Sequence, residues 1–292
     1  MGDRCDHCRT SKGRYQWKRR SLCAECFEQI TGTTPPATLD NSYVYQLGYL
    51  EVFEQYQFDT ERQYQKAGKT LCVLSDYYGA PESLKELSLL DVGCSAGLMT
   101  RQYAEEFKSV VGIDIDEPAV THAVRNYASD NLRFLVRDSM DTDLDSESFD
   151  VVTCAHIYEH VPDSHRLMSE IFRVLKKGGV CYFAAQNRLS FIEPHYGLPL
   201  LSIIPKPWAN TYLRLMRKGD YYYENLLTLR GLKRLVSSFR LVDYTMEVIR
   251  NPVRYSATEL LQPGSLKQKV ALAAATSAYF LCPTYIWLLV KE

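Results

Sequence analysis

The sequence predicts an α/β fold built on a mainly parallel sheet, and two observations lead to this prediction. Between residues 86 and 190, short apolar runs that suit buried strands alternate with longer helix-compatible stretches. The first run, Leu89–Val92, enters a glycine-containing turn, and a helix-compatible stretch follows from Leu98 to Phe107. A buried strand, a tight turn and a helix in this order begin a βαβ unit, in which glycine lets a ligand approach the backbone closely.

The remaining strands follow from further apolar segments. We expect them at Val110–Asp116, Leu132–Asp138, Ser148–Ala155, Val180–Ala185, Leu241–Ile249 and Tyr285–Lys291. The last segment overlaps an uncharged stretch, residues 270–290, that is long enough to span a bilayer. Pro283 and several hydroxyl side chains interrupt this stretch, so we expect a helix over 265–281 and then the strand. A peripheral membrane contact stays open.

The turn after the first strand carries a specific motif. It runs from Asp91 to Gly97 as D-x-G-x-S-x-G, which differs from the G-x-G-x-x-G of nicotinamide and flavin enzymes. The motif resembles motif I of the class I S-adenosylmethionine (SAM) methyltransferases, with Ser95 in place of the middle glycine. With the ordered segments that follow, residues 86 to about 190 resemble the type 11, UbiE-like branch of that family. The resemblance implies a seven-stranded Rossmann-like sheet with helices on both faces and an antiparallel last strand.

The resemblance also implies where SAM binds. Asp114 would hold the ribose hydroxyls, Ile115 would lie against the adenine, and Asp138 would accept from the adenine amino group. The expected cofactor-binding residues are Asp91, Gly93, Ser95, Gly97, Asp114, Ile115, Asp138 and Ser139.

Methyl transfer to an oxygen or nitrogen acceptor can need a general base. His156 is the first catalytic candidate, because it follows the apolar fourth strand where this fold places acceptor-facing groups. Glu193 and His195, in a later insert, are the second candidates.

The pattern His156-x-x-Glu159-His160 would place three side chains on one face of a helix. It resembles the Glu-x-x-Glu-His cluster of ubiquinone-pathway O-methyltransferases and small-RNA 2′-O-methyltransferases, which bind a divalent metal, but its first residue is histidine. Glu-His-Val also occurs at this place in metal-free relatives, where it serves packing and hydrogen bonding. A catalytic metal and a packing role therefore both stay open.

Two Cys-x-x-Cys pairs near the amino terminus predict a structural zinc site. The ligands would be Cys5, Cys8, Cys23 and Cys26. Two knuckles with fourteen residues between them suit tetrahedral coordination by four thiolates, and so short a module would fold largely through the metal. The basic loop between the pairs, residues 9–20, contains Tyr15 and Trp17. This loop suits either nucleic acid or a contact with the chain's own catalytic domain or a second copy.

These segments define the expected domains. Residues 1–32 form the zinc module, residues 33–85 a linker and amino-terminal helices, and residues 86–292 the SAM-dependent methyltransferase domain. Within it, an insert at 188–225 contains four prolines in a largely apolar setting, and we expect short helices that form a lid over the carboxyl ends of the strands.

The formal net charge of −1 gives no global electrostatic argument for nucleic acid. We therefore expect a SAM-dependent methyltransferase that acts on oxygen or carbon of a small-molecule, sugar or lipid-linked acceptor. RNA methylation is the alternative, because basic residues outnumber acidic ones in the zinc module and in residues 200–234. A second alternative is a non-catalytic zinc adaptor with a SAM fold. The chain begins without a signal-peptide pattern, so we expect a cytoplasmic protein, with peripheral membrane contact left open.

Overall fold

The computed structural model describes residues 15–17, 20–22 and 59–292. In the first part, β1 (Tyr15–Trp17) pairs antiparallel with β2 (Arg20–Leu22). The four cysteines predicted to bind zinc, and most of the predicted linker, lie outside the described residues.

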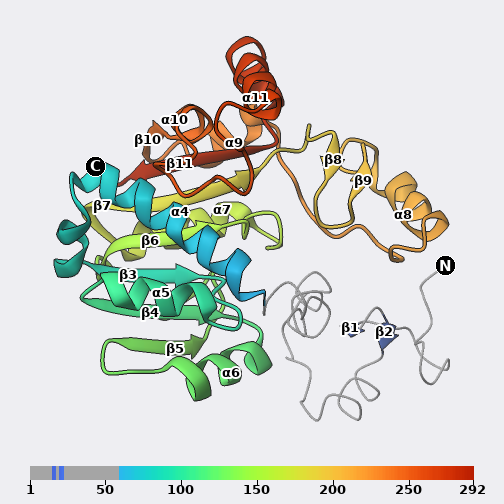
Figure 1. The fold of residues 1–292 in the computed structure, drawn as a ribbon. Helices are drawn as coiled ribbons and strands as arrows, with labels where there is room; N and C mark the ends of the chain where they lie inside the picture. The colour runs from blue at the N-terminus through green and yellow to red at the C-terminus, as the bar shows by residue number, and fades with distance from the viewer. Residues whose placement is uncertain (1–14, 18–19, 23–58) are drawn as a thin grey trace.

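A seven-stranded mixed sheet forms the centre of the fold, in the order β10-β11-β7-β6-β3-β4-β5 (Figure 1). Its strands are β3 (Ser88–Val92), β4 (Ser109–Asp114), β5 (Leu132–Val136), β6 (Phe149–Ala155), β7 (Leu175–Gln186), β10 (Arg240–Asp243) and β11 (Thr284–Val290). Strands β3 to β7 run parallel, and β11 lies antiparallel between β7 and β10. The predicted seven-stranded Rossmann-like sheet with an antiparallel last strand is confirmed.

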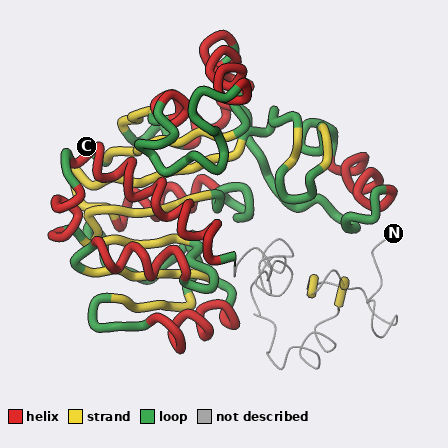
Figure 2. Tube along the Cα trace, viewed as in Figure 1, coloured by secondary structure: helices red, strands yellow, loops and turns green. Residues whose placement is uncertain are grey.

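Helices cover both faces of the sheet (Figure 2). One apolar cluster joins the sheet to α4 (Thr60–Tyr78), α5 (Leu98–Glu106), α6 (Glu117–Tyr127) and α10 (Thr245–Arg250). The other joins it to α7 (Ser164–Val174), α9 (Leu229–Leu235) and α11 (Leu266–Ser277). Short 3-10 helices, η1 (Pro81–Glu86) and η2 (Tyr279–Leu281), precede β3 and β11. Burial of apolar side chains on both faces explains why the parallel strands are continuous hydrophobic runs in the sequence.

Helix α4 crosses one face of the sheet, and its first turns lie at the side where the parallel strands end (Figure 1). The helix begins after Asp59, whose side chain accepts a hydrogen bond from the backbone N–H of Arg62. It ends at Gly79, which takes the left-handed conformation with φ of 90°. Both ends therefore carry ordinary caps, and the helix is fixed next to the ligand-binding edge of the sheet.

The predicted strand at Leu241–Ile249 is only half right. Residues Arg240–Asp243 form β10, but α10 begins at Thr245. The side chain of Asp243 accepts from the backbone N–H of Thr245 at 2.9 Å, so a local bond to the backbone ends the strand and begins a helix.

The insert also differs from the predicted set of short helices. Strands β8 (Ile192–Glu193) and β9 (Leu198–Pro199) form a small antiparallel pair, and α8 (Lys206–Leu215) follows. Gly197 makes the turn between the strands, with φ of 68° and its N–H bonded to the carbonyl of Glu193. Figure 1 shows these elements projecting beyond the edge where the parallel strands end.

The carboxyl-terminal stretch folds as a helix and a strand, as predicted. Among the described residues, no helix is both long enough and apolar enough to cross a membrane. Instead β11 lies inside the sheet, where Tyr285, Trp287 and Leu289 are fully buried. These side chains account for the apolar character of this part of the sequence.

Candidate active site

The loop after β3 is built from the predicted D-x-G-x-S-x-G motif. The N–H groups of Gly93 and Cys94 both donate to the carbonyl of Ile113 on β4, at 2.9 and 3.0 Å. Gly93 has φ of 78°, and a Cβ atom there would lie 2.1 Å from Cδ1 of Ile157. Glycine is therefore required at this position by both conformation and space.

Ser95 takes the backbone conformation that a glycine would take at the same place. Its φ is 45°, which is unusual for a residue with a Cβ atom. Its N–H donates to Oδ2 of Asp114 at 2.8 Å, and this charge-assisted bond offsets the backbone strain. The departure from the family motif leaves the turn intact.

Asp114 stands at the end of β4, facing this loop. Its second oxygen, Oδ1, accepts from the N–H of Asp116 at 2.9 Å. Burial raises the pKa of Asp114, although the backbone hydrogen bonds act in the opposite direction. Ile115 follows directly, and both residues line the large cavity described below.

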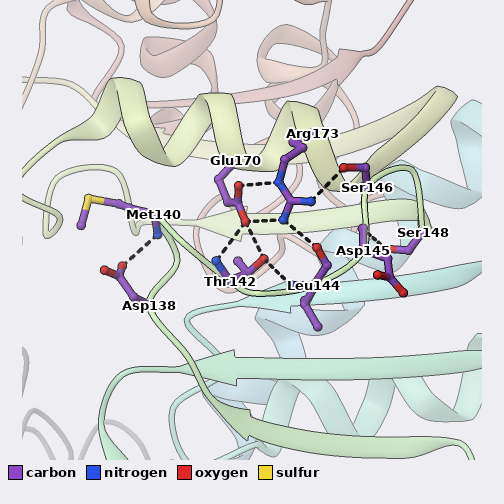
Figure 3. A network of polar contacts seen from close by, with 9 residues as sticks. All are labelled: Asp138, Met140, Thr142, Leu144, Asp145, Ser146, Ser148, Glu170 and Arg173. Carbon is purple, nitrogen blue, oxygen red and sulfur yellow. Dashed lines mark hydrogen bonds and ion pairs between the residues drawn. The ribbon is translucent and has the colours of Figure 1, made fainter.

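The loop after β5 positions Asp138 and Ser139 and is fixed by an ionic network (Figure 3). Oδ1 of Asp138 accepts from the N–H of Met140 at 2.9 Å. Farther along, Glu170 of α7 accepts from both the N–H and the hydroxyl of Thr142, at 2.9 and 2.6 Å. Arg173 binds Glu170 through two nitrogens, Nε and Nη2. The hydrogen bond from Arg173 lowers the pKa of Glu170 to about 2.

Asp91, the first residue of the motif, is buried and accepts hydrogen bonds from two hydroxyl groups. Thr100 of α5 donates to Oδ2 and Thr153 of β6 donates to Oδ1, each at 2.6 Å. Burial raises the pKa of Asp91 to about 6. Asp91 thus ties the first helix of the βαβ unit to two neighbouring strands.

A cavity of about 1250 Å³ lies at the ends of the parallel strands. All eight residues predicted to bind SAM line it: Asp91, Gly93, Ser95, Gly97, Asp114, Ile115, Asp138 and Ser139. SAM is a sulfonium cation, and the carboxylates on this side of the cavity suit a positive ligand. Gly93 and Gly97 line the cavity with backbone atoms alone, because glycine has no side chain, and a ligand can therefore approach the backbone of the loop closely. The residues present therefore fit SAM.

His156, the first catalytic candidate, lines the same cavity just after β6. Its backbone has φ of 60°, and its N–H donates to the carbonyl of Ala184 at 2.8 Å. The side chain is 42% exposed, and Nδ1 lies 3.7 Å from Oε1 of Glu159. His156, Glu159 and His160 do not share one face of a helix, because His156 takes a left-handed conformation and a turn follows at 158–160. His156 and Glu159 nevertheless meet.

The second candidates lie on the insert and form a pair. Nδ1 of His195 lies 2.6 Å from Oε1 of Glu193, which is fully buried. His195 lines the cavity, whereas Glu193 lies behind it and also accepts from the N–H of Tyr196. Burial opposes protonation of His195, but the bond to Glu193 and the nearby carboxylate of Glu224 outweigh it and raise the pKa to about 9.

The insert brings His195 against the turn after β6. The rings of His160 and His195 pack edge to face, with centroids 4.9 Å apart. Burial and the neighbouring His195 lower the pKa of His160 to about 3, so that its imidazole is neutral. Burial acts to raise the pKa of Glu159, but its histidine neighbours, His156 first, lower it overall.

Glu159, His160 and His195 have the geometry of a metal site. One ligand atom from each lies within 4.8 Å of the other two. Among the described residues, neither carboxylate oxygen of Glu159 takes part in a hydrogen bond, although the side chain is fully buried. A buried carboxylate without donors is costly, and a divalent cation would compensate it. Two imidazoles and a carboxylate are a donor set that transition metals and Zn²⁺ accept. These residues therefore fit a divalent metal.

Sequence reasoning missed part of this site. Glu224 and Tyr222, at the end of the insert, are buried beside it. Burial first, and then the carboxylates of Glu193 and Glu224, raise the pKa of Tyr222. Lys66 and Lys69 of α4 line the cavity. None of these residues belongs to a recognisable motif, and only the packing of distant segments brings them to the site.

Comparisons with known proteins indicate the activity of this domain. A family model described as "Methyltransferase domain" matches residues 90–183, from β3 to β7. The chain carries a methyltransferase domain. A ubiquinone biosynthesis O-methyltransferase of Coxiella burnetii (strain RSA 331 / Henzerling II) is 29% identical over 168 residues, which cover 56% of this chain and 68% of that protein. One of Pseudomonas fluorescens (strain SBW25) is 35% identical over 104 residues, covering 34% and 44%. The chain is a SAM-dependent methyltransferase.

Among solved structures, geranyl diphosphate C-methyltransferase from Streptomyces coelicolor A3(2) aligns with a TM-score of 0.45 and 19% identity. The alignment covers 76% of the present chain and 78% of the Streptomyces coelicolor chain.

Proposed function

We propose that the methyltransferase transfers a methyl group to a hydroxyl oxygen of a small, partly apolar molecule, free or lipid-linked. The observation that carries this proposal is the meeting of Glu159, His160 and His195, because both histidines line the cavity that the SAM-binding motif also lines. The relatives named above are O-methyltransferases of ubiquinone biosynthesis, which favours oxygen over carbon. Apolar side chains of α10 and α11 line another part of the cavity, including Val248, Ile249, Ala271 and Ala275.

Bound SAM supplies an electrophilic methyl group, and the protein has to align it with the acceptor. Asp114 would hold the ribose, and the Gly93–Gly97 loop would hold the rest of the cofactor close to the backbone. His156 lines the cavity and lies next to Glu159 of the cluster, where it can take the hydroxyl proton. Glu193 would act on His195 as a positioning residue, because it contacts the imidazole and does not line the cavity.

A divalent cation held by Glu159, His160 and His195 would lower the pKa of a hydroxyl bound to it. The cluster agrees with the resemblance of this segment to metal-binding Glu-x-x-Glu-His sequences. His156 stands where those sequences have their first glutamate, and its side chain lies near Glu159. The metal would therefore be held by fewer carboxylates than in those relatives, which favours zinc or another imidazole-binding metal over magnesium.

We further propose a structural zinc ion held by Cys5, Cys8, Cys23 and Cys26. Their spacing supports it, and the residues lie outside the described part of the chain. Cys23→Ser should release stoichiometric zinc from the full-length protein, measured by metal analysis after dialysis. A variant that still holds one zinc per chain through this module would contradict the assignment.

RNA is the second candidate acceptor, and one feature of the structure favours it. Arg230, Lys233 and Arg234 of α9 line a shallow groove together with the exposed ring of Phe280. Cations beside an exposed aromatic ring suit a nucleotide strand. A steep loss of substrate binding with added salt would support this candidate.

The decisive experiment transfers labelled methyl from SAM into a native extract that is then fractionated into RNA, protein, lipid and small molecules. We expect the label in the lipid or small-molecule fraction, with loss of labelling in Asp114→Ala. Label in RNA would instead establish the second candidate. Failure of the protein to bind SAM would favour the adaptor interpretation over both. Chelator followed by added zinc or magnesium tests the metal in the same assay.

A further inference from the structure

The cavity contains a second charged region that the proposed chemistry does not use. Lys66 and Lys69 of α4 are three residues apart, so they lie on the same face of the helix, and both line the cavity. Both side chains are partly buried. Within residues 59–292, neither ammonium group takes part in a hydrogen bond or an ion pair. Two adjacent cations that lose water without gaining a partner are unfavourable in the absence of a ligand.

The electrostatics of the two lysines agree with this description. Burial first, and then repulsion from Arg62 and Lys69, lower the pKa of Lys66 to about 8. Burial also lowers the pKa of Lys69. Glu259 acts in the opposite direction on both, but it is an exposed residue and does not reach ion-pair distance. An anion bound by both ammonium groups would remove this cost.

The charged residues around the lysines are mixed in sign, because Asp59, Glu259 and Arg62 also line the cavity there. Asp91, Asp114 and Asp138 line the side at the ends of β3, β4 and β5, where a sulfonium cation fits. The lysines lie on α4, and Lys267 of α11 also lines the cavity. The acidic group that affects Lys66 and Lys69 most is Glu259, which follows α10, and none of the carboxylates at the strand ends has a comparable effect on them. Lys66 and Lys69 thus lie on a different element of the cavity wall from the strand ends, where we propose that the cofactor's ribose binds.

We propose that Lys66 and Lys69 bind an anionic group, a carboxylate or a phosphate, on the methyl acceptor. This inference rests on the proposed function, because it assigns the acceptor to the part of the cavity between α4, α10 and α11. The acceptor would then carry an acid group at one end and the reacting hydroxyl at the other, next to the histidine cluster.

The test is calorimetric binding of two matched probes to the full-length protein saturated with S-adenosylhomocysteine. The probes are 3,4-dihydroxybenzoate and its neutral amide, which differ only in the charged group. We expect the acid to bind about tenfold or more tightly than the amide, as for hydrogen bonds to charged groups. The doubly substituted Lys66→Met, Lys69→Met protein should bind both equally, because Met keeps the aliphatic stem and removes the charge. Arginine at both positions should restore the preference.

The control is Lys108→Met, which removes an exposed lysine that does not line the cavity. It should keep the preference for the acid. Equal binding of the two probes to the unsubstituted protein, or no binding of either, would overturn the proposal. The proposal would also be overturned if the double variant bound S-adenosylhomocysteine more weakly but still preferred the acid probe. The lysines would then bind the carboxylate of the cofactor. Methyl transfer to either probe is scored separately, so failure of the proposed O-methylation is distinguishable from failure of anion recognition.

Discussion

Glu170→Gln tests whether the network in Figure 3 holds the cofactor loop in place. Glu170 is the shared acceptor for Arg173 and for both polar groups of Thr142. Arg173 also donates to the carbonyl of Leu144 at 2.7 Å and to the hydroxyl of Ser146 at 2.9 Å. Glutamine keeps an acceptor for Thr142 but removes the charge that pairs with the guanidinium.

The expected change in the free energy of unfolding follows from the pKa of Glu170, which falls from 4.5 to about 2. This shift corresponds to at most about 3.4 kcal/mol at 1.36 kcal/mol per pH unit. The side chain of Arg173 is 37% exposed, so solvent screening reduces the figure. We expect the free energy of unfolding to fall by about 1.5 kcal/mol in the variant at pH 7.

The sign of the pH dependence is fixed by the lowered pKa. Because Glu170 is more acidic in the folded state, its contribution is complete above the unfolded value of 4.5 and disappears as the pH falls through about 2. Urea unfolding of both proteins, followed by circular dichroism between pH 7 and pH 3, should therefore show a difference that narrows with acid. A difference below about 0.5 kcal/mol at pH 7, or one that does not change with pH, would refute this reasoning.

Three further predictions concern the site itself. Asp114→Ala should weaken SAM binding by about a hundredfold while the thermal unfolding transition stays cooperative, because the ribose hydroxyls would lose the charged acceptor that we propose for them. Unchanged affinity would mean that the ribose lies elsewhere. Ser95→Gly should keep SAM affinity and raise stability by up to about 1 kcal/mol in thermal unfolding, since Ser95 has φ of 45°; a loss of stability would contradict the strain argument. Glu159→Gln should weaken zinc binding to the cluster of Glu159, His160 and His195 by about tenfold or more, as measured by calorimetry. The control variant Glu170→Gln should keep the zinc affinity.

The sheet and the cofactor motif could be predicted because local sequence determines them. Parallel strands buried on both faces have to be apolar runs, and the boundaries of β4, β5 and β6 fall within about two residues of the predicted ones. The turn at Gly93 and Gly97 depends on residues that lie next to each other in the chain. All eight predicted cofactor residues consequently line one cavity.

The prediction failed where a single polar side chain decides the backbone. Asp243 ends β10 with one hydrogen bond to the N–H of Thr245, although apolar residues continue to Ile249. The left-handed backbone of His156 likewise prevents His156, Glu159 and His160 from sharing one face of a helix. Hydrophobic periodicity does not contain this information, because the bond from Thr245 to Asp243 depends on one donor and one acceptor.

The meeting of His195 with Glu159 and His160 could not be derived from the sequence, because it depends on how the insert leaves the sheet. Asn187, the first residue after β7, is fully buried, and its amide nitrogen donates to the carbonyls of Phe280 and Cys282 and to the hydroxyl of Tyr285. Three bonds from one amide fix the direction of the chain at this point against η2 and β11. Glu193 then fixes the ring of His195. The insert therefore forms part of the site. Asn187 fixes the start of the insert, and Glu193 fixes His195, the third candidate metal ligand.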